Sequence, residues 1–297
     1  MSDGPFELPF QSPAVPELLT GDSLLRFRCQ PGISCFNACC KCADVTLAPY
    51  DILRLKQRLG LDSEAFLRQY TVPFQMDQDG VPGVKLRTDD SGACLLLAGE
   101  AGCGVYADRP LVCRYYPVAL LNLREKDALA PVSAYSLVKE PHCLGHLEDR
   151  EIAIADYREE QGCPQYDEYN RGWYELILKK RSAGPGVGRL SEMSLQLFFM
   201  ASYDLDRFRR FVASDKFRAT YALGDAFFEQ VAQDDLLLLD FAYRFLRQVL
   251  FGERSIEEAP DAWIKRVDER KAVWDLRAQA EIARRQAEED RKYRDDV

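Results

Sequence analysis

The spacing of apolar residues changes near residue 150 of this 297-residue chain. In the second part, apolar residues recur every three to four positions, which is typical of amphipathic helices. The helices predicted there span 156–162, 165–181, 191–213 and 225–251. The first part has short apolar runs between turn residues, which predict two helices, at 49–59 and 63–70, and short strands at 24–28, 44–47, 84–87, 118–123 and 132–138. We therefore expect an α+β fold that is mostly α, in which a small cysteine-rich half with short strands and loops packs on a helical C-terminal half.

Composition divides the chain into four expected regions. Residues 1–20 are rich in proline and predict an extended N-terminal arm, and residues 21–150 contain nine of the ten cysteines. Residues 151–259 form the helical region, within which the glycine-rich stretch 182–188 predicts a flexible connection and a candidate boundary. Residues 260–297 predict a densely charged C-terminal helix. Two local signals refine the first helix, because Thr46 is expected to cap it and Gly60 to end it.

Five cysteines fall between Cys29 and Cys42, in a stretch that reads CQPGISCFNACCKC. They are Cys29, Cys35, Cys39, Cys40 and Cys42. Packing of a helix or strand does not require so many thiols, whereas a loop that binds a metal through its thiolates does. The chain also lacks a secretory signal at its N-terminus, so we expect a cytoplasmic protein whose thiols stay reduced. Clustered cysteines in a reducing compartment favour metal binding over disulfides.

The later cysteines, Cys94, Cys103, Cys113 and Cys143, each stand beside a turn or a short element. The pattern predicts a hairpin with Cys94 and Cys103 on its two arms and a short helix carrying Cys113. We expect both batches of cysteines to converge on one region. Eight or more thiols exceed what one tetrahedral ion can bind, so two ions, or an iron–sulfur cluster plus an ion, are expected. The vicinal pair Cys39 and Cys40 would chelate a single ion badly, so the two are expected to serve different metal atoms, or one of them is structural.

These residues resemble the CxxCxxCC family of zinc- or iron-chelating proteins, which includes the YkgJ-like cysteine-cluster proteins. The resemblance covers residues 24–150 and is carried by CFNACC, by HCLG and by a stretch containing Cys94, Cys103, Tyr106, Arg109, Pro110, Cys113 and Arg114. It implies metal ligation by Cys29, Cys35, Cys39, Cys40, Cys94, Cys103, Cys113 and Cys143, but not by Cys42 or Cys163. The three residues between Cys35 and Cys39 depart from the family spacing. That spacing is more similar to the flagellin lysine methylase branch, for which the resemblance implies an iron–sulfur cluster, expected to be of the 4Fe-4S type.

Other side chains near the cysteines have candidate roles. Arg109 and Arg114 flank Cys113 and could offset the negative charge of several thiolates, or they could form ordinary salt bridges with Asp108 or Glu100. Tyr106 could pack over the metal site. His142 precedes Cys143 and could be a ligand or could donate a hydrogen bond to one, but a surface histidine of the loop is the preferred interpretation. The aromatic run Tyr157, Tyr166, Tyr169 and Trp173 predicts a core between the two halves.

Charge and hydropathy restrict the partners. The net charge of −9 argues against nucleic acid, and no apolar run is long enough for a membrane span. The charged tail predicts a solvated helix on the surface, with a partner-binding helix as the alternative, so a protein partner through the C-terminal helices stays open.

Three functions fit the sequence. The first is a metal or iron–sulfur protein whose centre is structural or transfers electrons. The second is an iron–sulfur enzyme for redox chemistry or S-adenosylmethionine-linked methyl transfer, since Cys35, Cys39 and Cys42 have the spacing of radical S-adenosylmethionine enzymes. The absence of regular βα alternation counts against the barrel of those enzymes. The third is a zinc-stabilised interaction domain.

Overall fold

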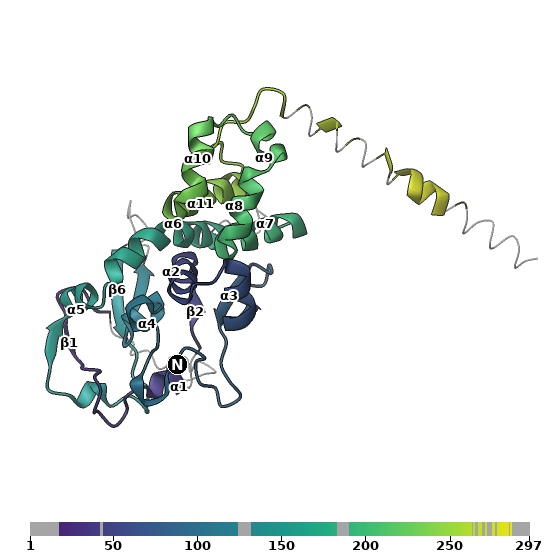
Figure 1. Ribbon diagram of the computed structural model, residues 1–297. Coiled ribbons are helices and arrows are strands. Elements are labelled where there is room, and N and C mark those ends of the chain that lie inside the picture. The colour runs from purple at the N-terminus through teal and green to yellow at the C-terminus, as the bar shows by residue number, and fades with distance from the viewer. Residues whose placement is uncertain are drawn as a thin grey trace, which may run out of the picture.

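The computed structural model describes residues 18–41, 44–123, 132–182 and 190–262, together with part of 264–286. Helices account for most of its regular structure, and the strands form three small antiparallel sheets. The predicted α+β fold, mostly α, is confirmed, with a loop-rich cysteine half packed on a helical half (Figure 1). Within the described part of the chain, no helix is both long enough and apolar enough to cross a lipid bilayer.

The first half of the chain consists of short elements separated by loops. Its strands are β1 (Leu24–Arg26), β2 (Thr46–Leu47), β3 (Thr71–Gln75), β4 (Pro82–Leu86), β5 (Val118–Leu123), β6 (Val132–Leu137) and β7 (Glu151–Ala153). Its helices are α1 (Ala38–Lys41), α2 (Pro49–Leu59), α3 (Ser63–Tyr70) and α4 (Leu111–Tyr115), and its 3-10 turns are η1 (Gly99–Ala101), η2 (Tyr106–Asp108) and η3 (Gly145–Leu147). The five predicted strands are present as β1, β2, β4, β5 and β6, whereas β3 and β7 were not predicted.

The strands pair in the orders β1-β7, β2-β4-β3 and β5-β6. In the first sheet, the fully buried Leu25 lies opposite Ile152. This pairing ties the segment that leads into the cysteine loop to the residues just before the helical half. In the second sheet, β3 is an edge strand on which Pro73 lies opposite Val84, a position that proline tolerates because an edge strand needs fewer ladder hydrogen bonds.

The second half is helical throughout its described part. Its helices are α5 (Ile154–Glu160), α6 (Cys163–Ser182), α7 (Glu192–Tyr203), α8 (Leu205–Ala213), α9 (Asp215–Thr220), α10 (Asp225–Gln233) and α11 (Asp235–Phe251). The prediction of single helices over 191–213 and 225–251 was wrong. Asp204 accepts a hydrogen bond from the backbone N–H of Arg207, and Asp234 accepts from those of Leu236 and Leu237. Each aspartate therefore caps a new helix inside the predicted one.

Helix α2 is fixed at both ends. The side chain of Asp51 accepts a hydrogen bond from the N–H of Ala48 at 2.8 Å, and Gly60 ends the helix in the left-handed conformation with φ of 65°. The prediction of the terminating glycine is confirmed. The prediction that Thr46 caps the helix was wrong, because Thr46 belongs to strand β2 and pairs with Lys85.

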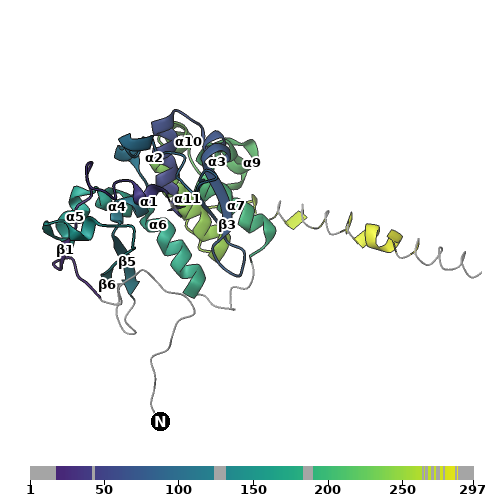
Figure 2. The same ribbon diagram turned by 90° about the horizontal axis from the view of Figure 1, so that it is seen from below.

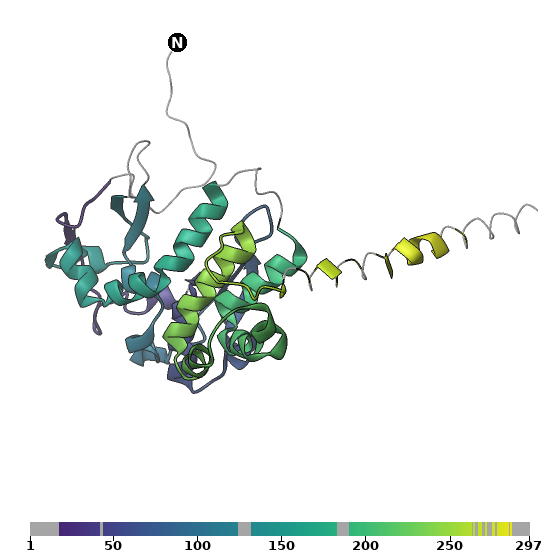
Figure 3. The ribbon, with the colours of Figure 1, turned by 90° about the horizontal axis from the view of Figure 1, so that it is seen from above.

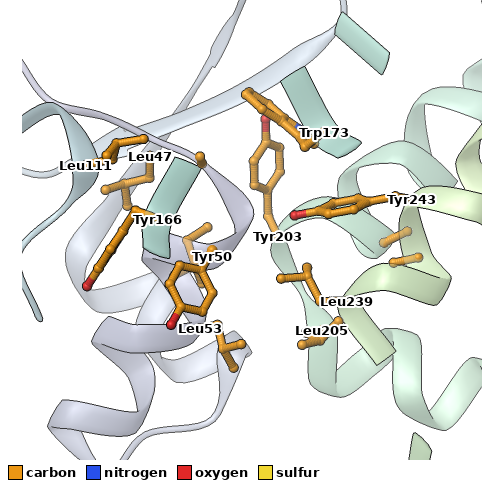
Figure 4. Close-up of a cluster of buried hydrophobic side chains, with 14 of the residues drawn as sticks. Leu47, Tyr50, Leu53, Leu111, Tyr166, Trp173, Tyr203, Leu205, Leu239 and Tyr243 are labelled. Carbon is orange, nitrogen blue, oxygen red and sulfur yellow. The ribbon is translucent and has the colours of Figure 1, made fainter. Parts of the chain in front are cut away.

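The core between the two halves is aromatic. Figure 4 shows Tyr50 and Tyr166 on one side of this core, and Trp173, Tyr203 and Tyr243 on the other. All five are buried, and the ring centroids of Tyr50 and Tyr166 are 4.9 Å apart in an edge-to-face contact. The prediction that the aromatic residues of 157–173 form this core is confirmed for its buried members.

Polar contacts join the halves as well. The N–H of Tyr50 donates to Asn170 Oδ1 at 3.0 Å, which links α2 to α6. Lys56 of α2 is buried and its ammonium lies 2.8 Å from a carboxylate oxygen of Asp206 in α8. That carboxylate also accepts from the backbone N–H and hydroxyl of Ser63. Helices α2, α3 and α8 therefore meet at one ion pair.

The remaining helices build a layered body. Helices α6 and α11 lie side by side, as Figures 2 and 3 show, and α11 also packs against α7 and α8. The described residues of 264–286 lie apart from this body in all three views, with Val267, Leu276 and Ile282 exposed. The expected arm over 1–17 and the connection over 183–189 lie outside the described residues, as do Cys42 and the side chains of Trp263, Val273 and Trp274.

Candidate metal centre

The first cysteine segment, residues 28–41, is a chain of turns that ends in the four-residue helix α1. Gly32 and Asn37 adopt positive φ values of 98° and 67°, which glycine and asparagine tolerate better than other residues. The amide of Asn37 reaches the carbonyl of Gly99 at 3.5 Å. The segment thus folds back on itself and carries Cys39 and Cys40 on its single helical turn.

The second segment, residues 94–113, is attached to the first through its backbone. The N–H of Cys94 donates to the carbonyl oxygen of Cys40 at 2.8 Å. Cys103 forms an isolated bridge with Leu97, and Cys94 forms one with Thr88. The predicted hairpin is therefore present only as single bridges around the turn η1, because the arms are too short for a ladder. Both cysteines lie next to α1.

Helix α4 carries Cys113 and is held by two buried side chains. Asp51 Oδ1 accepts a hydrogen bond from the N–H of Leu111 at 2.9 Å. Arg114 donates to the carbonyl oxygens of Ala107, Arg109 and Gln161 at 2.6, 2.9 and 2.7 Å. These bonds fix the first and last turns of the helix and so fix the direction of Cys113.

The third segment, residues 140–147, lies against the first. The N–H of Leu144 donates to Cys35 Sγ at 3.2 Å, and the N–H of Arg28 donates to the carbonyl of Gly145 at 3.1 Å. A Cβ at residue 145 would stand 2.7 Å from the carbonyl oxygen of Arg28, so only glycine allows this approach. Cys143 is thereby brought close to Cys29 and Cys35.

Cys39 lies near cysteines of all three segments. The pKa of Cys29 is raised to about 11, mainly by burial and then by the thiols of Cys39, Cys35 and Cys143, while Arg109 acts in the opposite direction. Burial also raises the pKa of Cys113, and there the contributing thiols are Cys94, Cys39 and Cys103. The sulfur atoms of Cys39 and Cys40 are 3.9 Å apart. The hydrogen bond from Cys40 lowers the pKa of Cys39 and favours its thiolate.

The structure thus brings together the eight cysteines singled out by the resemblance. They are Cys29, Cys35, Cys39, Cys40, Cys94, Cys103, Cys113 and Cys143. Cys163 lies elsewhere, fully buried at the start of α6, where burial and then Asp167 raise its pKa to about 12. All nine described cysteines are free thiols.

The flanking cations and Tyr106 are tied to one another and to backbone groups. The guanidinium of Arg109 lies 4.0 Å from the ring centroid of Tyr106 and donates to the side chain of Gln161 at 2.5 Å. Its positive charge lowers the pKa of Cys29, which agrees with the charge-balance interpretation for that thiol. Asp108 forms salt bridges with Arg54 and Arg58, not with Arg109. Arg114 is buried and donates to carbonyl oxygens, so its role here is to hold α4.

A group of polar side chains surrounds Cys143. The hydroxyl of Tyr116 and Nε2 of His142 are buried and make no hydrogen bond. Burial is the main cause that raises the pKa of Tyr116, followed by its proximity to Cys143 and Glu140. His142 Nε2 lies 3.4 Å from a carboxylate oxygen of Glu140. Sequence reasoning did not single out Glu140, and its position three residues before Cys143 was the available signal.

Comparison with known proteins gives one match. Residues 28–143 match the family model CxxCxxCC, described as a putative zinc- or iron-chelating domain. This stretch is a CxxCxxCC domain. No curated protein and no solved structure matches the chain. The CxxCxxCC domain contains all eight of the gathered cysteines, whereas Cys163 lies outside it. The chain therefore carries a cysteine cluster of the zinc- or iron-chelating kind.

The donor atoms of the CxxCxxCC domain suit such a metal. Thiolates are ligands of zinc and of iron–sulfur clusters, and each bound thiol must give up its proton. As the side chains are placed, no group of three or more Cys, His, Asp or Glu residues in the described part could hold an ion. The thiols are close in space but not yet at ligand spacing. A change of χ1 rotamer moves each sulfur without moving the backbone, so the gathered donor set fits a thiophilic metal.

Proposed function

We propose that this chain is a cytoplasmic cysteine-cluster protein whose thiolates hold an iron–sulfur cluster, metal ions or both, and that the centre has a structural role. The observation that carries the proposal is the meeting of three loop segments around Cys39, each contributing thiols.

The structural role is supported by the way the three segments are built. Residues 28–41, 94–113 and 140–147 contain turns, isolated bridges and helices of at most five residues. Such segments have few ladder hydrogen bonds to hold them together. A metal centre would cross-link them, and its binding free energy would then be part of the folding free energy. One hydrophobic core runs through both halves, and Cys94, Cys103 and Cys143 pack against it from the cysteine side.

Electron transfer is the second candidate, and exposure of the cluster supports it. Cys29 and Cys39 are exposed, and the neighbouring side chains of Leu95, Tyr106, Val112 and Leu144 are exposed as well. An iron–sulfur cluster at this surface would be within reach of a partner protein, whereas a zinc ion has no redox chemistry.

An enzyme role has less support in the geometry. One pocket, of about 320 Å³, is lined by residues of α3, β3, β4 and α7, and another, of about 390 Å³, is lined by residues of α6 and α11. Neither is lined by a cysteine. A substrate bound in either pocket would therefore not be held directly against the thiols.

The proposal is tested by purifying the full chain without oxygen and measuring iron, zinc and sulfide. An iron–sulfur form is expected to be brown with broad absorption near about 400 nm, and a zinc form to be colourless. A reversible spectral change on reduction would support electron transfer, and its absence would leave the structural role. Protein that holds neither iron nor zinc would overturn the proposal.

Substitutions connect the metal to the cysteines. Cys39→Ser and Cys113→Ser are expected to lower metal content and thermal stability together, because loss of a ligand is coupled to folding. Cys163→Ala is the matched control and is expected to leave metal content unchanged. Unchanged metal content in both serine variants would contradict the assignment of those ligands.

A further inference from the structure

Backbone contacts separate the eight thiols into two groups. The first group comprises Cys29, Cys35 and Cys143. The N–H of Leu144 donates to Cys35 Sγ, and the N–H of Arg28 donates to the carbonyl of Gly145. These two hydrogen bonds hold the chain around Cys29 and Cys35 against the chain around Cys143. This group is built from the first and third segments.

The second group comprises Cys40, Cys94, Cys103 and Cys113. The backbone of Cys94 is hydrogen-bonded to Cys40, and the N–H of Gly104 donates to the carbonyl of Leu96 at 2.9 Å, which places Cys103 alongside Cys94. Cys113 belongs to the same segment as Cys94 and Cys103 and lies on helix α4 at its end. This group joins the first and second segments.

Cys39 completes the first group. Adjacent residues of a helix point about 100° apart, so Cys39 and Cys40 face different directions from the single turn of α1. The second group already has four thiols with Cys40. The sulfur of Cys39 lies 3.9 Å from that of Cys40. Cys39 therefore lies at the contact between the groups.

We propose that the cluster is two metal centres of four thiols each, one formed by Cys29, Cys35, Cys39 and Cys143 and the other by Cys40, Cys94, Cys103 and Cys113. The vicinal pair Cys39 and Cys40 joins the two centres. This proposal rests on the proposed function and adds the number of centres and the partition of the ligands.

A buried polar group beside Cys143 supports the first centre as well. The hydroxyl of Tyr116 makes no hydrogen bond, which is costly unless a charged ligand group comes close. A metal-bound thiolate at Cys143 would accept a hydrogen bond from Tyr116. The second centre has a different environment, since the helix α4 that carries Cys113 is held there by the hydrogen bond from the Leu111 N–H to Asp51.

The two centres are expected to differ in lability. The first includes Cys29 and Cys39, which are exposed residues, whereas the four cysteine residues of the second are partly buried. A chelator is therefore expected to remove the metal of the first centre sooner. Each divalent ion that binds four neutral thiols gives a complex of charge −2 and releases four protons to the buffer.

The experiment is a titration of reduced, metal-free full-length protein with Co²⁺ or Cd²⁺ under oxygen-free conditions. Two equivalents bound through thiolates are expected for the wild type. Cys35→Ser and Cys103→Ser are each expected to lose one equivalent. The double variant Cys35→Ser/Cys143→Ser is expected to lose no more than Cys35→Ser alone, whereas Cys35→Ser/Cys103→Ser is expected to lose both. Cys163→Ala is the control that retains two.

Three outcomes overturn the partition. They are a wild type that binds one equivalent, a single variant that loses both, and a Cys35→Ser/Cys143→Ser variant that loses both. If the serine variants do not fold, cadmium NMR of the wild type decides, because two all-thiolate signals are expected and one signal contradicts the proposal. The failure of the proposed function is distinct, since it would be the absence of iron and zinc from the protein as isolated.

Discussion

Asp51 accepts a hydrogen bond from the backbone N–H of Leu111 at 2.9 Å, and with its other oxygen it accepts from Ala48 at 2.8 Å. One carboxyl group thus holds the first turn of α2 and the first turn of α4 together. Its burial raises the pKa of Asp51 from its ordinary value of 3.8 to about 6, although both hydrogen bonds act in the opposite direction. The carboxyl group that orients the Cys113 helix is therefore hard to ionise.

This pKa predicts how stability depends on pH. Because the pKa of Asp51 is higher in the folded state, the folded state binds more protons between pH 3.8 and about 6, and its stability falls as the pH rises through that window. A tenfold change in proton affinity corresponds to about 1.4 kcal/mol, so the loss is about 3 kcal/mol. Asp51→Asn cannot ionise, so the stability of the wild type relative to this variant is expected to decrease by that amount. Urea unfolding of both proteins across this pH window, at matched metal content, measures the difference in their free energies of unfolding. A difference that does not change with pH would contradict the raised pKa of Asp51.

Arg114 provides a second prediction. Its guanidinium donates to three carbonyl oxygens and lies 4.1 Å from the ring centroid of Tyr166. Lysine cannot make these bonds in a planar arrangement, so Arg114→Lys is expected to cost about 2–4 kcal/mol in the free energy of unfolding. Arg171→Lys is the control, because Arg171 is exposed and pairs with an exposed glutamate, and a change below about 0.5 kcal/mol is expected. Equal losses of stability in the two variants would show that the buried hydrogen bonds of Arg114 do not contribute to the free energy of unfolding.

Gly145 is expected to be essential for the contact of the third cysteine segment. In Gly145→Ala the new Cβ would meet the Phe27 ring at 2.5 Å and the Arg28 carbonyl at 2.7 Å, so the loop must shift. A loss of about 1–3 kcal/mol and weaker metal binding are expected. Gly21→Ala is the control, since its Cβ would make an ordinary 3.5 Å contact with Ala155. Thermal unfolding and metal titration of both variants check this, and an unaffected Gly145→Ala protein would argue against the close approach.

The ion pair between Lys56 and Asp206 gives a fourth prediction. Burial acts to raise the pKa of Asp206, but the hydrogen bonds from Lys56 and Ser63 outweigh it and hold the pKa below its ordinary value. Lys56→Met would leave the carboxylate without its cation and is expected to cost about 2–4 kcal/mol. The double variant Lys56→Met/Asp206→Asn is expected to lose less than the sum of the two single variants. A double-mutant cycle by denaturant unfolding measures the coupling, and strict additivity would refute it.

Element boundaries could be predicted from the sequence where local chemistry decides them. Gly60 ends α2 by its left-handed conformation, and Pro110 stands at the N-cap of α4, one residue before the first turn in which its type predicted it. The two long helices were predicted wrongly because apolar periodicity continues through Asp204 and Asp234, whose side chains cap new helices. The aspartates were visible in the sequence, but periodicity alone does not show which helical aspartate acts as a cap. Strand β3 was missed because Pro73 counts against a strand unless its edge position is known.

The candidate site, too, could be predicted from the sequence only in part. The cysteine spacing predicted that distant thiols meet, but not which thiols are neighbours. That depends on contacts such as the Cys94 N–H to the Cys40 carbonyl and the Leu144 N–H to Cys35 Sγ, which join residues far apart in the chain. The buried, unpaired hydroxyl of Tyr116 could not be predicted either, because burial is set by tertiary packing. Composition therefore predicted the type of ligand atom, whereas only the tertiary structure shows which cysteines are neighbours.

The pairing of β1 with β7 has a practical consequence for shortened versions of this protein. A fragment cut to residues 28–143 would lose both of these strands, and with them the partner surface of Tyr50 on α6. Apolar side chains that are now covered would face water, and such a fragment is expected to aggregate even when supplied with metal. The cysteine-rich stretch therefore depends on the flanking strands and helices for its fold, and biochemical work on it needs the full-length chain.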